Sequence, residues 1–117
     1  MSNLSNRKIA YVSTYFPQRC GIAAYTSFLV EEIRKASPKT HIKIIAEKEA
    51  LAVKEEGFEV VPCWSRSENY VEQILDCLDD VNLLHVQHEY SIYKFDDRLP
   101  TLLKKLPQKV RKVLTIH

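Results

Sequence analysis

Three separate segments of this sequence contain the side chains best suited to chemistry. The first, 15–21, contains a cysteine and ends at Gly21; the second is His88-Glu89-Tyr90; the third is His117. A histidine titrates near neutral pH and can hydrogen-bond a hydroxyl group or act as a base. The segments lie far apart along the chain, so joint chemistry requires a fold that brings them together.

Gly21 stands directly before a predicted helix. The first N–H groups of a helix lack internal partners and carry the positive end of its dipole, so a phosphate can bind there, and a residue without Cβ lets it approach closely. The alternative is that Gly21 only supplies a permissive turn. Nearby, Arg19 could add a positive charge or simply be solvated, and Cys20 at a helix start could be reactive.

Two common cofactor motifs are excluded by the glycine count. Gly21 and Gly57 are the only glycines, too few for the dinucleotide fingerprint or the Walker loop. A zinc site could be assembled from protonatable residues, but no recognised ligand spacing supports it, so we expect no metal. The residues concerned are His85, His88, Glu89 and His117.

Composition bounds the class of protein. The chain has 117 residues, enough for one domain, with 27% charged and 45% hydrophobic residues, as in globular proteins. Its 17 Lys and Arg against 15 Asp and Glu give a net charge of +2, which lacks the lopsided basic field of nucleic-acid binders. We therefore expect no nucleic-acid partner.

The cysteines and the apolar runs favour a cytoplasmic location. Three cysteines without a C-x-x-C pair suit a reducing compartment, and no apolar run approaches the ~18 residues of a membrane span. A basic cluster within 104–112 is by default a solvated face, with peripheral contact to anionic lipids at the inner membrane face as the alternative. Its members are Lys104, Lys105, Lys109, Arg111 and Lys112.

Hydrophobic periodicity predicts strands that alternate with helices. Strands are expected at 9–12, 42–46, 58–61 (stopped by Pro62), 81–87 and 110–116, and helices at 22–35, 70–78 and 99–106, the second of these preceded by a capping box at 65–68. This alternation predicts an α/β fold, a doubly wound, Rossmann-like parallel sheet of about five strands. If the strand order is 3-2-1-4-5, the three polar segments converge where that order reverses.

Three segments together resemble the N-terminal domain of glycosyltransferase family 4. They are PQRCGIA at 17–23, LLHVQHEY at 83–90 and VLTIH at 113–117, in the family's order and across most of the chain. The resemblance implies the acceptor-side half of a two-domain, retaining GT-B enzyme that transfers a hexose from a nucleotide sugar to a carbohydrate or lipid-linked acceptor without a metal. A donor-binding C-terminal domain would lie outside residues 1–117, so the isolated chain should be inactive.

The resemblance also implies roles for individual residues. By position, Gly21 matches a loop glycine near the donor diphosphate, His117 a histidine at the reacting centre, and 88–90 with Arg19 the acceptor side. Cys20 departs from the two-glycine form of the loop. A competing hypothesis is a non-catalytic α/β module that binds an anionic ligand or a partner protein at the same edge. An uncovered last strand, 110–116, favours the front part of a longer protein.

Overall fold

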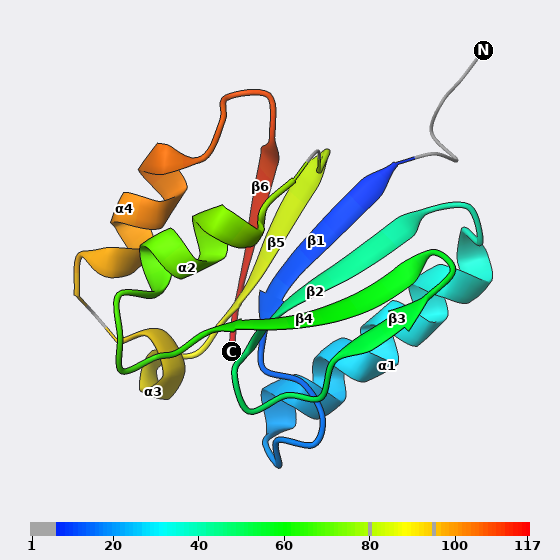
Figure 1. Ribbon diagram of the computed structural model, residues 1–117, viewed down its shortest axis with the longest axis horizontal. Helices are drawn as coiled ribbons and strands as arrows, with labels where there is room; N and C mark the ends of the chain where they lie inside the picture. The colour runs from blue at the N-terminus through cyan, green and yellow to red at the C-terminus, as the bar shows by residue number, and fades with distance from the viewer. Residues whose placement is uncertain (1–6, 80, 95) are drawn as a thin grey trace.

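The computed structural model describes residues 7–79, 81–94 and 96–117, which form one six-stranded sheet with helices on both faces (Figure 1). Its strand order is β3-β4-β2-β1-β5-β6, and every pairing is parallel except that of β3 with β4. The strands are β1 Lys8–Ser13, β2 His41–Glu47, β3 Val53–Glu55, β4 Phe58–Trp64, β5 Leu83–His88 and β6 Arg111–Ile116.

Helices pack on both faces because both faces of the central strands are apolar. Helix α1 (Gly21–Ala36) covers one face, and α2 (Tyr70–Cys77) and α4 (Arg98–Lys105) cover the other (Figure 1). The short helix α3 (Tyr90–Tyr93) follows β5 directly. Two buried clusters result, one under α1 and a larger one under α2 and α4.

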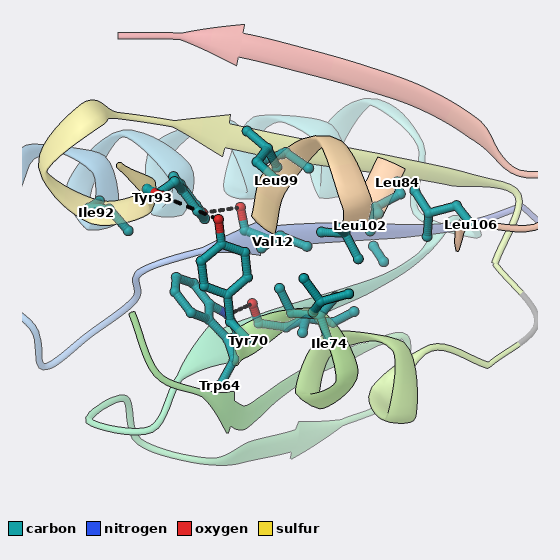
Figure 2. Close-up of a cluster of buried hydrophobic side chains, with 14 of the residues drawn as sticks. Val12, Trp64, Tyr70, Ile74, Leu84, Ile92, Tyr93, Leu99, Leu102 and Leu106 are labelled. Carbon is teal, nitrogen blue, oxygen red and sulfur yellow. Dashed lines mark hydrogen bonds between the residues drawn. The ribbon is translucent and has the colours of Figure 1, made fainter. Parts of the chain in front are cut away.

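Aromatic residues anchor the larger cluster close to the carboxyl ends of the strands (Figure 2). The indole N–H of Trp64 donates to the carbonyl of Ile45 at 2.8 Å, and the hydroxyl of Tyr93 donates to the carbonyl of Val12 at 3.3 Å. Tyr70 in turn donates its hydroxyl to the carbonyl of Tyr93. Each of these buried polar tips therefore has a partner, and α3 is fixed to β1 and to the start of α2.

The predicted α/β architecture is confirmed, with a sheet that is mostly parallel. Without the short antiparallel β3, the observed order is 3-2-1-4-5, the order on which the expected convergence depends, so β1 and β5 are neighbours where the order reverses. β3 was not predicted; it forms a hairpin with β4 through Gly57, whose φ of 77° suits glycine. The last strand is largely exposed, as expected, with Ile116 71% accessible.

Two local predictions were wrong. Pro62 does not end its strand, because β3 pairs only as far as Val60 and leaves β4 with a ladder on one side, where proline is tolerated. The capping box at 65–68 does not form either. The helix begins at Tyr70, as expected, but the N–H of Glu68 donates to the backbone carbonyl of Ser65 in a turn and not to its side chain.

None of the helices in the described part of the chain has both the length and the apolar character needed to cross a bilayer.

Candidate functional site

A cavity of about 460 Å³ lies at the carboxyl edge of the sheet, where the strand order reverses. We call it the first cavity. Its wall combines the start of α1, the loop after β4, the segment after β5 and the end of β6, so the three segments singled out in the sequence do converge. The lining residues are Cys20, Gly21, Ile22, Tyr25, Arg66, Glu89, Ile92 and His117.

The start of α1 is built by a cysteine in place of the usual capping residue. Cys20 has extended backbone angles, and its Sγ accepts the N–H of Ala23 at 3.4 Å and lies 3.0 Å from the hydroxyl of Thr14. This thiol satisfies one of the N–H groups that a helix start leaves without a partner. Gly21 and Ile22, which begin the helix, line the cavity, where the positive end of the helix dipole favours an anion.

Gly21 is not required by the conformation or the packing of the chain. Its φ is not positive, and a Cβ built on it would meet no atom within 4 Å. The permissive-turn alternative therefore has no support from the backbone. What glycine provides at this position is open space beside the first helical N–H groups.

His117 is held against the cavity by three contacts. Its Nε2 lies 2.8 Å from Oε1 of the fully buried Gln87, its backbone N–H donates to the carbonyl of His88 at 2.9 Å, and its ring meets the ring of Tyr25 edge-on at 4.9 Å between centroids. Because an amide oxygen only accepts, this contact requires the proton on Nε2 and leaves Nδ1 of the neutral ring as an acceptor.

The four residues predicted to contact the acceptor do not all line the first cavity. Glu89 lines the first cavity. His88 is buried, with its ring stacked on Tyr93 at 5.6 Å, and is not among the lining residues; it contacts His117 through its carbonyl. Tyr90 begins α3, but its side chain lies outside the described residues. Arg19 lines a neighbouring cavity.

That second cavity has a volume of about 580 Å³ and shares Cys20 and Arg66 with the first. It is lined by residues from the loops after β1, β2 and β4. They are Gln18, Arg19, Cys20, Glu47, Glu49, Ser65, Arg66 and Ser67. The sequence analysis named only two of these residues, Arg19 and Cys20, as candidates.

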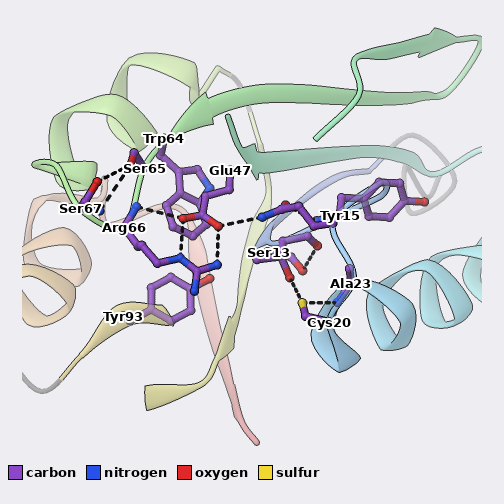
Figure 3. A network of polar contacts seen from close by, with 12 residues as sticks. Ser13, Tyr15, Cys20, Ala23, Glu47, Trp64, Ser65, Arg66, Ser67 and Tyr93 are labelled. Carbon is purple, nitrogen blue, oxygen red and sulfur yellow. Dashed lines mark hydrogen bonds and ion pairs between the residues drawn. The ribbon is translucent and has the colours of Figure 1, made fainter. Parts of the chain in front are cut away.

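Glu47, at the end of β2, joins the three loops (Figure 3). Its side chain is only 3% exposed and accepts from Nε, Nη2 and the backbone N–H of Arg66 at 2.8, 2.6 and 3.0 Å, and from the amide of Gln18 at 2.9 Å. Burial alone would raise the pKa of Glu47, but the bonds from Arg66 and Gln18 outweigh it and lower the pKa. Because its two oxygens already accept four hydrogen bonds, this carboxylate has a structural role and does not act as a base.

Arg98 supports the same region from α4. Its Nη1 donates to the carbonyls of Arg66 and Glu68, both at 2.8 Å, its Nε and Nη2 bind Asp96, and its guanidinium lies 4.5 Å from the ring centre of Tyr70. These contacts fix the loop 65–69 that carries Arg66 between the two cavities.

Among the residues that the structure describes, no group of three His, Cys, Asp or Glu side chains could hold a metal. His85 is bonded through Nε2 to the hydroxyl of Thr115 and packs on Tyr11. Burial and the neighbouring His117 lower the pKa of His85. The basic cluster of 104–112 lies on α4 and at the start of β6, at the opposite edge of the sheet from the cavities, and Lys105 pairs with Glu72.

Comparison with protein-family models, with curated proteins and with solved structures returned no significant match. The function of the chain is therefore argued from its residues and their geometry.

Proposed function

We propose that this chain is the acceptor-side domain of a retaining glycosyltransferase that uses a nucleotide sugar as donor and transfers a hexose to a carbohydrate or lipid-linked acceptor. The observation that carries the proposal is that Gly21 and His117 line one cavity of about 460 Å³. They are the two residues to which the resemblance assigns the donor diphosphate and the reacting centre. The proposal includes a cytoplasmic location and a donor-binding domain beyond these 117 residues.

The first cavity offers two features that such a transfer needs. Departure of a nucleoside diphosphate requires groups that stabilise growing negative charge, and the open N–H groups at the start of α1 are suited to part of this task. Transfer also requires a positioned acceptor hydroxyl. The ring of His117 and the carboxylate of Glu89 lie at the cavity wall, where each can hydrogen-bond an acceptor hydroxyl.

The test uses the natural reading frame that contains this chain. The purified protein is incubated with a panel of nucleotide sugars, with and without simple sugar acceptors, and release of the nucleoside diphosphate is measured. Acceptor-dependent release from one donor supports the proposal. No turnover of any donor would contradict it and would favour the non-catalytic binding module.

A Gly21→Val variant tests the phosphate role. A Cβ at this position meets no atom within 4 Å in the free chain, so the free energy of unfolding should change by less than about 1 kcal/mol. Donor affinity should fall about tenfold or more because the side chain obstructs the phosphate. Ala24→Val, at an exposed position of α1 outside the cavity lining, is the matched control. Equal donor affinity in the two variants would contradict the proposal that the donor phosphate binds at Gly21.

A further inference from the structure

We propose that the second cavity is a binding subsite for a second sugar unit of the acceptor, so that the preferred acceptor is at least a disaccharide; the inference rests on the proposed function. The first cavity has room for the unit that reacts, beside Gly21 and His117. The second cavity adjoins it, since Cys20 and Arg66 line both cavities. We infer that an elongated ligand with one unit in the first cavity extends its next unit into the second.

The shape of the second cavity is preorganised. Glu47 connects Gln18 in the loop after β1 to Arg66 in the loop after β4 by direct hydrogen bonds, as Figure 3 shows. Arg98 fixes the second of these loops from behind through two backbone carbonyls. Ligand binding here therefore costs little conformational entropy in the loops. Under this condition, a few hydrogen bonds are enough to give useful affinity.

The charges of the cavity favour a neutral polyhydroxyl ligand over an anion. Its two arginines are balanced by two glutamates, and one pair, Arg66 with Glu47, is closed on itself by a bidentate contact. A phosphate binds where donors and positive charge outnumber acceptors. Here the carboxylate of Glu49 faces the same space as the guanidinium of Arg19.

The lining also supplies donors and acceptors together. Ser65 and Ser67 each present a hydroxyl, and their oxygens lie 3.0 Å apart at the rim. Since every sugar hydroxyl both donates and accepts, a wall of hydroxyl, amide, carboxylate and guanidinium groups suits a saccharide. Arg66 lines both cavities and can therefore contact both units.

The experiment titrates the 117-residue chain, labelled with ¹⁵N, and follows its amide resonances. The probes are methyl α-glucoside and methyl α-mannoside, the disaccharides maltose and α-1,2-mannobiose, and glucose 6-phosphate with inorganic phosphate as the anionic arm. We expect one disaccharide to bind about tenfold more tightly than its monosaccharide. The additional shifts should fall on residues 18–20 and 65–67.

A cavity-filling variant and its control assign the gain to the second cavity. Ser67→Tyr, at an exposed loop position, should abolish the disaccharide advantage and leave monosaccharide binding unchanged. Asn69→Tyr, in the same loop but outside the lining, should retain the advantage. Equal affinity for one and two sugar units, no sugar binding, a gain that survives Ser67→Tyr, or preferential binding of the phosphates with shifts on residues 65–67 would each overturn the subsite.

The outcome is distinguishable from failure of the proposed function. Transfer to a monosaccharide without any disaccharide preference would contradict the proposal that the second cavity is a subsite, but it would agree with the proposed transferase function. Disaccharide binding that Ser67→Tyr removes, in a protein that turns over no donor, would retain the cavity as a glycan site and overturn the transferase.

Discussion

The ring nitrogen Nε2 of His117 lies 2.8 Å from the amide oxygen of Gln87, a side chain with no exposed surface. The amide nitrogen of Gln87 has no hydrogen-bond partner among the described residues. The contact with this buried amide holds the ring of His117 in one orientation at the cavity wall.

Replacing Gln87 by Met should therefore separate activity from stability. One hydrogen bond is lost and one buried unpaired group is removed, so the free energy of unfolding should change by less than about 1 kcal/mol. Transfer by the longer protein should fall about ten- to hundredfold because the ring of His117 loses its orientation. Turnover rates and urea unfolding of the same preparations measure the two effects.

His117→Ala is the reference for this comparison. It should lower kcat at least as much as Gln87→Met, and the double variant should be no worse than His117→Ala, because Gln87 acts through the histidine. Normal turnover in His117→Ala would show that His117 has no role in the transfer reaction. Additive losses in the double variant would instead give Gln87 a role of its own.

The fold was predictable because buried strands and amphipathic helices differ in period. The strand at 42–46 and the helix at 22–35 were recognised from that difference. β3 was missed because it has three residues and only one of them, Val53, is partly buried. The start of α2 at Tyr70 agrees with the prediction, but the capping box was wrong because Ser65 and Glu68 make turn and side-chain contacts that sequence spacing does not distinguish from such a box.

The site was predictable only in part. The convergence of Gly21, Glu89 and His117 follows from strand order alone, since parallel strands end at one edge. Glu47 and Arg66 were missed although each follows or ends a strand at that same edge. His88 was a candidate because it follows a predicted strand at this edge. Considering the end of every strand in the same way would have identified Glu47 and Arg66. Their pairing depends on side-chain geometry that no pattern in one sequence encodes.

The Glu47–Arg66 contact predicts a specific pH dependence of stability. The folded pKa of Glu47 lies below its ordinary value, so the contact stabilises the fold above the unfolded pKa, about 4.3, and this contribution is lost as the pH falls through the lowered folded pKa. The difference in free energy of unfolding between the wild type and Glu47→Gln should be largest near neutral pH, about 2–4 kcal/mol, and should shrink on acidification.

Urea unfolding between pH 7 and about pH 3 measures this difference. Glu31→Gln, on the exposed side of α1, controls for the loss of one negative charge from the surface. A difference between Glu47→Gln and the wild type that stays constant across this range would show that the charge of Glu47 contributes nothing and that only its shape matters.

Arg98 should be irreplaceable by lysine, although it lies outside both cavity linings. A single ammonium group cannot bind Asp96 through two nitrogens, reach two backbone carbonyls and stack on Tyr70 at once. Arg98→Lys should lower the free energy of unfolding by about 1–3 kcal/mol and speed amide exchange in the loop 65–69. Hydrogen-exchange mass spectrometry measures the loop directly, with Arg111→Lys on the exposed β6 as the matched control. Unchanged protection of this loop in Arg98→Lys would mean that the Glu47 contacts hold Arg66 in place without help from α4.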